Sequence, residues 1–524
     1  MDTKALRQKI LDLAIRGKLV PQDPNDEPAS VLLERIRAEK QQMVKEGKLK
    51  AKDIKNDTVI FKGDDNLHYE QFADGTVKCI EDEIPFELPD GWAWARLGNI
   101  GEIITGGTPS KSHHEYYGNA FPFFKPADLD QGRKTIISSE YLSEKGKSCC
   151  RIIPKFSTAV CCIGSIGKCG YLNVEGTTNQ QINSIIPNID SLYVYYYCSS
   201  DCFSEQLLSL ASATTIAIVN KSKLESVFIP VPPMVEQKRI ANTLDTALEL
   251  IETLEVEKSD ILVAINNVKS KILDLAIRGK LVPQDPNDEP ASVLLERIRA
   301  EKEELIKQGK IKRDKKESVI FKGDDNSYYL NKDGQCVDIG DDIPFDIPNS
   351  WEWTLLGNIV QLNPRNKISD DMEVSFVPMP LIDDGFSGNH VSEIRKWNDV
   401  KTGFTHFAEG DIGVAKITPC FENRKSTVFN NLCNGYGAGT TELHILRTYA
   451  DTISHKFLLF FVKTDYFIQA GKQTFSGAVG QQRIGKEYIS NSLFPLPPLA
   501  EQERIVNAVE TLFAQIDKIS EQIL

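Results

Sequence analysis

The spacing of apolar residues in the middle of the chain predicts one long helix. From Leu244 to Leu275, apolar side chains recur at alternating steps of three and four residues, the heptad period of a coiled coil, and only Lys258 interrupts the series. A cluster of prolines precedes this stretch and Gly279 follows it, and these are signals for the start and the end of a helix. We therefore expect a helix over residues 235–279, about 65–70 Å long at roughly 1.5 Å per residue.

The same apolar seam occurs at both ends of the chain. The C-terminal stretch repeats its first half, from Val509 to Ile523, and the N-terminal stretch repeats its second half, at Leu6, Ile10 and Leu13. We expect the two terminal helices to stack end to end and to lie antiparallel against the central helix. A long heptad helix is typically a scaffold, and this one would fix the separation and orientation of two globular units.

An internal repeat covers most of the sequence. Residues 9–40 and 271–302 are identical at an offset of 262, residues 84–100 resemble 343–359, and residues 229–255 resemble 494–520. Joining the termini would give two complete copies of 262 residues, half of the 524 in the chain. The sequence is therefore a circularly permuted tandem duplication, and it predicts a pseudo-two-fold molecule.

Between the repeated stretches lie two windows in which the copies diverge, and both have the pattern of a mixed α/β domain. Apolar runs at 158–163 and 182–186 predict strands in the first window. In the second, residues 411–426, 435–446 and 475–489 mix glycine, amide, hydroxyl and basic residues in loops. Such side chains bond to base edges and phosphates, although polar glycine-rich loops are also common without any ligand.

Charge neither indicates nor excludes a nucleic-acid partner. The chain has 61 basic and 74 acidic residues, a net charge of −13. Residues 92–228 hold 12 Lys/Arg and 11 Asp/Glu, and residues 351–493 hold 14 and 15, so these two windows together are neutral. The whole negative charge lies on the repeated segments, which leaves a phosphate-binding face possible in the windows.

Composition is that of an ordinary soluble protein of several domains. No apolar run approaches the roughly 18–20 residues of a membrane-spanning helix, and the N-terminal stretch alternates charged with apolar residues, so we expect neither a membrane anchor nor export. Eleven cysteines, an odd number, indicate reduced thiols and a cytoplasmic location.

Motifs for catalysis and metal binding are absent or incomplete. The stretch from Gly480 to Lys486 has the glycine and lysine spacing of a phosphate-binding loop, but Glu487 stands where the hydroxyl residue belongs. The cysteines of the first window lack the spacing of a zinc site, and we interpret them as buried apolar residues. We expect no catalytic residue, no metal site and no cofactor in this chain.

Several motifs resemble the specificity subunit of type I restriction–modification systems, and the resemblance covers essentially the whole chain. AIRGKLVPQDPNDEPASVLLERI, present twice, is similar to the spacer of that family, and PVPPMVEQKRI and PLPPLAEQERI are similar to the entry into its helices. TGGTPSK and TTNQQINSIIP in the first window resemble one type of target recognition domain. TPCFENRK, GAGTTELHIL and SGAVGQQRIG in the second resemble another.

The resemblance implies an α+β fold with two α/β target recognition domains joined by long antiparallel coiled-coil helices. Each domain would recognise one part of an asymmetric bipartite site in double-stranded DNA, and the helices would set the spacer. The repeated surfaces would bind two modification (methyltransferase) subunits for adenine N6 methylation, and restriction subunits would add cleavage. S-adenosylmethionine, ATP and Mg²⁺ would be held by those partners.

The predicted organisation is a series of seven segments. They are an N-terminal helical segment (1–48), a connecting segment (49–91), recognition domain 1 (92–230), the central helical spacer (231–310), a second connecting segment (311–350), recognition domain 2 (351–495) and a C-terminal helix (496–524).

The candidate DNA-contacting residues are polar or basic side chains in the windows. They are Thr108, Ser110, Lys111, Asn179, Gln180, Gln181, Lys221 and Lys223 in the first domain, and Arg365, Lys416, Arg424, Lys425, Gln481, Gln482, Arg483 and Lys486 in the second. Two alternatives stay open: an enzyme with one catalytic domain, which the missing motifs disfavour, and a coiled-coil scaffold whose globular domains bind proteins.

Overall fold

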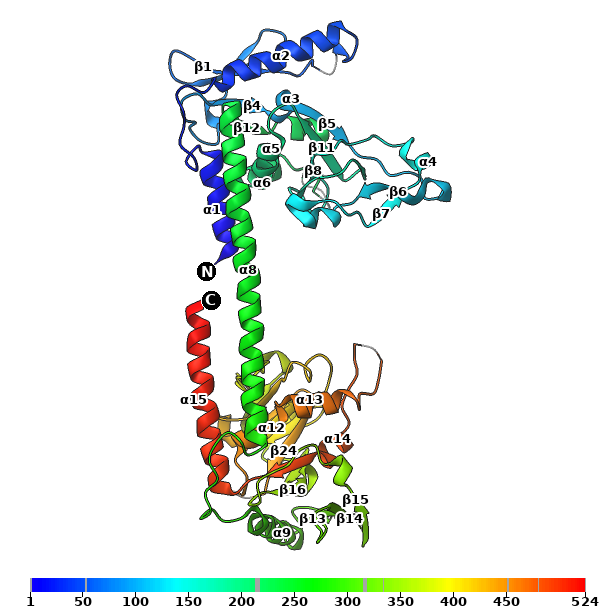
Figure 1. Cartoon of the computed structure of the whole chain (residues 1–524), viewed down its shortest axis with the longest axis vertical. Helices are drawn as coiled ribbons and strands as arrows, with labels where there is room; N and C mark the ends of the chain where they lie inside the picture. Colours follow the sequence, from blue (N-terminus) through cyan, green and yellow to red (C-terminus); the bar gives the residue numbers. More distant parts are fainter. Residues whose placement is uncertain are drawn as a thin grey trace. The chain divides into compact units, whose positions relative to one another are not determined.

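The computed structural model contains two compact units, Met1–Glu257 and Lys258–Leu524. It describes residues 2–51, 54–212, 217–313, 318–332, 334–449, 452–478 and 480–523. The division between the units falls inside helix α8 (Met234–Ile277), which matches the predicted central helix to within two residues at each end (Figure 1). The predicted duplication is thus confirmed at the level of the fold.

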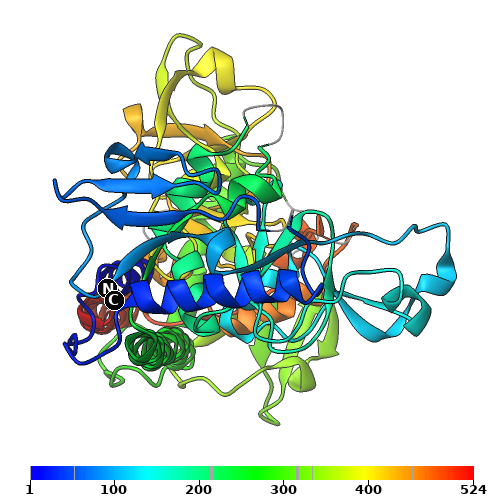
Figure 2. The same cartoon turned by 90° about the horizontal axis from the view of Figure 1, so that it is seen from above.

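Each unit has a frame of helices and a small antiparallel sheet. In unit 1 the frame consists of α1 (Thr3–Ile15), α2 (Ala29–Lys45), the first half of α8, and the sheet β1 (Val59–Lys62), β2 (His68–Gln71) and β3 (Val77–Cys79). Figure 2 shows α2 running beside these strands. In unit 2 the equivalent elements are the second half of α8, α9 (Ala291–Lys307), α15 (Leu499–Ile523), β13 (Ser318–Lys322), β14 (Tyr328–Lys332) and β15 (Gln335–Asp338).

The recognition domain of unit 1 is built on a four-stranded sheet of order β5-β11-β8-β9. These strands are β5 (Gly101–Thr105), β8 (Thr158–Cys161), β9 (Cys169–Tyr171) and β11 (Ile182–Pro187), so both predicted strands are confirmed. A pair joins the domain to the frame, β4 (Ala93–Arg96) with β12 (Phe228–Val231), and a three-stranded sheet of β6 (Tyr117–Phe124), β7 (Glu140–Leu142) and β10 (Thr177–Thr178) forms a side lobe. With α4 (Glu144–Lys147), this lobe lies on the side of the unit away from α1 (Figures 1 and 2).

Helices cover these sheets and begin at identifiable caps. In unit 1 they are α3 (Leu97–Ile100), α5 (Ser191–Cys198), α6 (Asp201–Ser209) and α7 (Lys221–Glu225), with the 3₁₀ segment η4 (Asp128–Lys134). The Asp190 carboxylate accepts from two backbone N–H groups of α5, and the Ser200 hydroxyl accepts from one of α6. Almost all of α5 is buried, so it forms the centre of the domain core.

Recognition domain 2 repeats this architecture although its sequence differs. Its four-stranded sheet has the order β17-β24-β21-β22, with β17 (Val360–Leu362), β21 (Ile412–Ala415), β22 (Ser426–Val428) and β24 (Leu443–Thr448). The joining pair is β16 (Glu352–Leu355) with β25 (Leu493–Leu496), and the second sheet contains β18 (Glu373–Val377), β19 (Glu393–Lys396), β20 (Thr405–Ala408) and β23 (Tyr436–Gly439). Its helices are α10 (Leu356–Ile359), α11 (Trp397–Val400), α12 (His455–Val462), α13 (Asp465–Lys472) and α14 (Lys486–Asn491).

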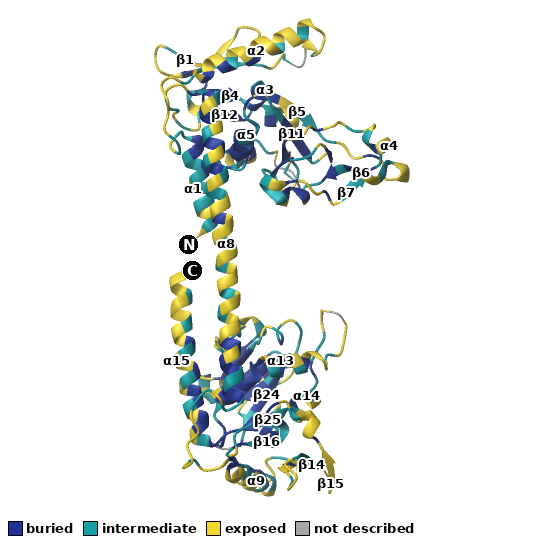
Figure 3. Cartoon of the chain, in the orientation of Figure 1, coloured by how far each residue is buried: buried dark blue, intermediate teal, exposed yellow. Residues whose placement is uncertain are grey.

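Both terminal helices pack antiparallel to α8, each within its own unit. Arg7 of α1 pairs with Glu255 at 2.9 Å, and Lys269 pairs with Asp517 of α15. The predicted continuous seam is wrong in its middle, where Leu254, Ile261 and Val268 are 44%, 37% and 49% exposed (Figure 3). Within this chain, burial at the seam is confined to positions nearer the two recognition domains, such as Leu244 and Ile272.

The repeated motifs make the same contacts in both units, and this explains their similarity. The Trp92 indole donates to Glu236 at 3.1 Å, and its counterpart Trp351 donates to Glu501 at 2.9 Å. Each glutamate belongs to the E-Q pair at the start of a long helix, so this bond joins helix to recognition domain. Burial raises the pKa of both carboxyls above the usual value.

In each copy a further ion pair holds the proline-rich loop on the long helix that carries the bonded glutamate, α8 in unit 1 and α15 in unit 2. Arg239 bonds to Asp26 at 2.6 Å, and Arg504 bonds to Asp288 at 2.5 Å.

Gly279 ends α8 with φ +65°, and a Cβ there would lie 2.4 Å from Pro348, so only glycine fits this turn. The described helices include none long and apolar enough to span a membrane.

Candidate nucleic-acid interface

The candidate loops of unit 1 meet at one end of the four-stranded sheet, which we call tip 1. It comprises residues 106–111, 179–181, 162–164 and 217–223. Gly107 donates to the Thr178 carbonyl at 2.9 Å, Cys162 donates to the Gln181 carbonyl at 2.8 Å, and Val219 donates to the Cys162 carbonyl at 2.9 Å. Four segments that are distant in sequence are thereby fixed side by side.

The corresponding end of the sheet in unit 2, tip 2, has the same backbone pattern. Its described residues are 363–367, 416–418, 440–442, 476–478 and 480–486. Lys416 donates to the Glu442 carbonyl and Ile484 donates to the Lys416 carbonyl, both at 3.0 Å. Comparison with tip 1 makes Lys416 the counterpart of Cys162 and Glu442 the counterpart of Gln181.

Isolated β-bridges extend this equivalence to the last loop. Ile163 pairs with Ile218 and Ser212 pairs with Ile218 in unit 1, while Ile417 and Ser476 both pair with Arg483 in unit 2. Arg483 therefore occupies the position of Ile218. The two tips share one backbone scaffold and present different side chains.

The structure brings together most of the predicted residues of the first domain. Thr108 and Gln180 are exposed and hydrogen-bonded to each other, and the Asn179 amide donates to Gln181 at 3.0 Å. Asn179 itself is buried, so it supports the turn that presents Gln180.

The remaining residues of the first set lie around this cluster. Ser110 and Lys111 are exposed on the loop that follows Thr108. Lys221 is exposed at the start of α7, and Lys223 donates to Ser212 at 2.7 Å.

In the second domain, six of the eight predicted residues lie at tip 2. Gln481 and Lys486 are exposed, and Lys486 opens α14 as Lys221 opens α7. Gln482, Arg483 and Lys416 are half-buried on the two loops that the bridge between Ile417 and Arg483 joins. Arg365 is exposed, and its guanidinium lies 3.2 Å from the Phe404 carbonyl oxygen and 3.3 Å from His406.

Arg424 and Lys425 are separate from this group because internal acceptors hold their cationic groups. Arg424 donates to the Lys463 carbonyl at 2.9 Å and to Asp465, and Lys425 donates to the Ile382 carbonyl at 2.8 Å. A partly buried cation needs such partners, and these bonds direct both side chains toward the flank of the sheet.

Electrostatics at tip 2 centres on one ion pair. Arg483 donates to the Glu442 carboxylate through Nε at 2.9 Å and Nη2 at 3.0 Å, and these bonds hold the pKa of Glu442 below its usual value. Beneath the tip, His444 and His406 are buried, and burial lowers the pKa of both imidazoles. Both rings are therefore neutral supports at physiological pH.

Sequence reasoning missed two residues at these tips. Arg151 is exposed, and its guanidinium lies 3.4 Å from the Thr105 carbonyl oxygen, at the base of the loop that carries Thr108. Forty-six residues separate them, so only the folded chain reveals the proximity. Glu442 was visible in GAGTTELHIL, but a carboxylate is unexpected in a surface that is predicted to face phosphates.

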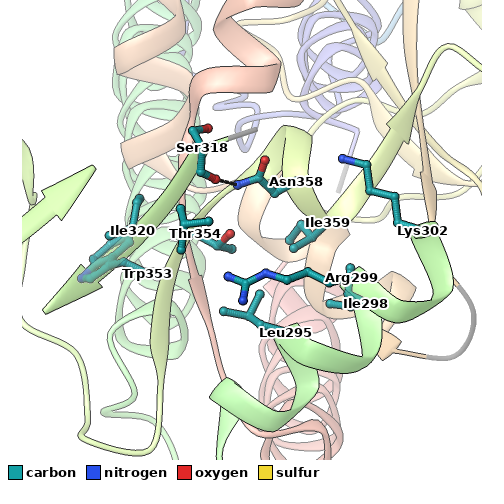
Figure 4. Close-up of a pocket in the computed structure, with 11 residues that line it drawn as sticks. Leu295, Ile298, Arg299, Lys302, Ser318, Ile320, Trp353, Thr354, Asn358 and Ile359 are labelled. Carbon is teal, nitrogen blue, oxygen red and sulfur yellow. Dashed lines mark hydrogen bonds between the residues drawn. The ribbon is translucent and has the colours of Figure 1, made fainter. Parts of the chain in front are cut away.

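One small cavity belongs to a structural junction of the frame. A cavity of about 50 Å³ lies between α9, β13 and β16, where Asn358 donates to the Ser318 carbonyl at 2.7 Å (Figure 4). Asn99 makes the same bond to Thr58 in unit 1, so this junction is part of the repeated frame. Among the described residues, no group of three potential ligands is arranged to hold a metal ion.

Comparison with known proteins relates this chain to a family. The family model described as the type I restriction modification DNA specificity domain matches residues 89–266 and 348–524. The specificity subunits of the type I restriction enzymes EcoAI and EcoEI from Escherichia coli are 48% and 44% identical to this chain over 264 residues, half of its length. The matches span 42% and 41% of those relatives, about two fifths of their length.

A solved structure supports the fold. Its subject is the structural basis of complex assembly and conformational transition of the type I R-M system, and it matches 84% of this chain and 94% of its own with a TM-score of 0.54 and 15% identity. The two family-model matches coincide with the two recognition domains and the helices that follow them. The chain therefore belongs to the family of type I restriction–modification DNA specificity domains, with one such domain in each half.

Proposed function

We propose that this chain is the DNA sequence-recognition subunit of a type I restriction–modification complex and has no catalytic activity of its own. Each recognition domain contacts one part of an asymmetric bipartite site in double-stranded DNA. The observation that carries the proposal is the pair of tips, which have the same backbone bonds and different polar side chains. One scaffold with two sets of hydrogen-bonding groups suits two different half-sites.

The candidate contacts divide by chemistry. Gln180, Gln181, Gln481, Gln482 and Arg483 have the planar groups that bond to base edges. Lys111 and Lys486 are exposed cations suited to phosphates, which position a protein without selecting a sequence. Lys221 is exposed as well, although it pairs with Glu225 at 3.5 Å. Arg151 joins this second group.

The repeated frame is proposed to bind two copies of one modification subunit. Exposed residues of the identical segments form the same ion pair twice, Arg35 with Glu27 and Arg297 with Glu289. Burial inside one chain does not explain identity at these exposed positions. Two identical partners would need the same exposed residues twice, and recent duplication of the segment is the alternative explanation.

The exposed apolar positions along α8 are a second candidate contact for these partners. Leu250 and Leu254 lie in unit 1, and Val263 and Val268 lie in unit 2. S-adenosylmethionine for adenine N6 methylation would be bound by the modification subunits, and ATP with Mg²⁺ by restriction subunits.

The test is co-expression of this chain with the methyltransferase subunit from its own operon in a host without DNA adenine methylation, followed by mapping of N6-methyladenine. The expected result is one bipartite asymmetric motif that disappears when this gene is omitted. Exchange of residues 105–228 or 360–493 for the window of another specificity subunit should change one half of the motif. Absence of any motif while the complex assembles would favour a scaffold whose globular domains bind proteins.

A further inference from the structure

The backbone at Arg483 is fixed on both sides by hydrogen bonds. Ser476 donates to the Arg483 carbonyl at 3.1 Å, and Arg483 donates back to the Ser476 carbonyl at 2.9 Å. Its neighbours are bonded as well, since Gln482 accepts from Thr418 and Ile484 donates to Lys416. The Cα–Cβ bond of Arg483 therefore has a defined direction before any ligand arrives.

The guanidinium is held in the same way. Besides the two bonds to Glu442, Nη1 donates to the Gln481 carbonyl at 2.7 Å. Arginine has five N–H donors, and these three bonds leave one N–H on each Nη atom. The side chain is 40% exposed, so these two donors remain accessible at the tip.

We propose that Arg483 contacts a guanine in the half-site of recognition domain 2 and that Glu442 is the residue that positions it. The inference rests on the proposed function and adds to it the identity of one base and one contact. Guanine presents O6 and N7 side by side in the major groove, and two neighbouring N–H groups of one guanidinium match them. An arginine already held by a carboxylate loses less side-chain freedom on binding.

Charge favours a base over a phosphate as the partner of Arg483. Phosphate contacts derive their strength from net positive charge and the release of counterions. The Arg483–Glu442 pair carries no net charge, so it attracts a phosphate only weakly. The ion pair does not change the ability of the remaining Arg483 N–H groups to donate directional hydrogen bonds to a base. Lys486, three residues further on, is an exposed cation better suited to the backbone.

The equivalent position in unit 1 carries a different side chain. Ile218, which occupies the place of Arg483, is 41% exposed, and Gln181 occupies the place of Glu442. Neither residue supplies a cation there. The guanine contact should therefore occur in one half of the bipartite site only.

The experiment compares Glu442→Gln, Arg483→Ala and Arg483→Lys in the co-expressed complex, first by mapping N6-methyladenine and then by duplex binding. Glu303→Gln is the matched control because Glu303 makes a similar two-bond pair with Arg313, at 2.7 and 2.6 Å, outside the recognition domain. At the repeat offset Glu303 corresponds to Gln41, so the pair is not part of the repeated surface.

The expected result is relaxation of one guanine in one half-site by Arg483→Ala and Arg483→Lys, and partial relaxation of the same guanine by Glu442→Gln. Binding to the wild-type motif should weaken about tenfold to hundredfold for Arg483→Ala and about tenfold for Glu442→Gln. A duplex with 7-deazaguanine at that position, which lacks N7, should weaken the wild type and leave Arg483→Ala unchanged. Glu303→Gln should match the wild type throughout.

Three results would overturn the inference. One is an unchanged motif in both Arg483 variants, and another is an equal loss for all target sequences, which identifies a phosphate contact. The third is a change at a cytosine in Glu442→Gln alone, which makes the carboxylate the base contact. Because the other half of the motif reports that each variant is folded, these outcomes differ from failure of the proposed function, in which even the wild-type chain directs no motif.

Discussion

Replacement of Trp351 by phenylalanine should separate the hydrogen-bonding from the packing role of the helix-to-domain junction. Trp351 is 3% exposed, and its indole donates to the fully buried Glu501 at 2.9 Å. A hydrogen bond to a charged group contributes about 1.5–3 kcal/mol, and loss of part of a buried ring adds about 1–2 kcal/mol. We expect Trp351→Phe to lower the free energy of unfolding of this unit by about 3–4 kcal/mol.

Trp353, which lies in strand β16, provides a matched control. It is 1% exposed, and among the described residues its indole nitrogen has no hydrogen-bond partner. Trp353→Phe therefore removes a similar part of a ring without breaking a bond, and it also removes a buried donor that was unsatisfied. We expect a decrease of about 1 kcal/mol or less.

The assay is urea unfolding of the purified chain, followed by far-UV circular dichroism, for both variants and for each combined with Glu501→Gln. The carboxylate hydrogen bond predicts a coupling of about 1–2 kcal/mol between Trp351→Phe and Glu501→Gln, and none between Trp353→Phe and Glu501→Gln. Equal losses for the two tryptophan variants, or zero coupling at Trp351, would refute the assignment.

Three further outcomes follow from contacts elsewhere. Asp245→Asn removes the half-buried ion pair with Arg133, at 3.1 and 3.2 Å, and should lower the free energy of unfolding by about 1 kcal/mol. It should also speed hydrogen exchange in η4, and unchanged exchange there would show that this ion pair does not hold η4 on α8. Iodoacetamide at neutral pH should modify the exposed Cys79, Cys149 and Cys336 in the native chain. Cys162 and Cys169, in which burial raises the pKa to about 11, should react only after unfolding, as mass spectrometry would show. Burial lowers the pKa of Lys463 to about 7, far below that of the unfolded chain, so the unfolded state binds more protons above that pH and stability should rise from pH about 7 upward. In Lys463→Met this rise should be smaller, and an identical pH profile for both proteins would exclude the buried amine as its source.

The frame of helices in each unit was predictable because its apolar residues follow a heptad period and its motifs occur twice in the sequence. Heptad spacing identified α8, the flanking prolines and Gly279 located its ends to within two residues, and the duplicated motifs located two equivalent units. The exposed middle of the seam was not predictable, since an apolar heptad looks the same whether this chain or another protein covers it.

The residues of the two tips were predictable in type but not in geometry. Glycine-rich polar loops led to the prediction of Thr108, Gln180 and Arg483, which lie at the tips, yet the same reasoning selected Lys425, whose amine bonds to backbone carbonyls of its own domain. Whether a cation in a loop faces solvent or an internal acceptor depends on contacts between segments far apart in sequence. For the same reason the pairing of Arg483 with Glu442 was not foreseen.

The contacts that dock each recognition domain on its helix differ, although the frame is repeated. In unit 1, Arg133 and Lys134 bond to Asp245 and Glu252 of α8, and in unit 2, Lys456 of α12 bonds to Glu510 of α15. Asp245 and Glu510 are counterparts at the repeat offset of 265. The helix therefore offers a carboxylate at the same place in both units, and each domain reaches it with a cation from a different element. A domain moved from one unit to the other would find its acceptor as long as its own docking cation moved with it. An exchange of domains should therefore carry η4 or α12 together with the rest of the domain.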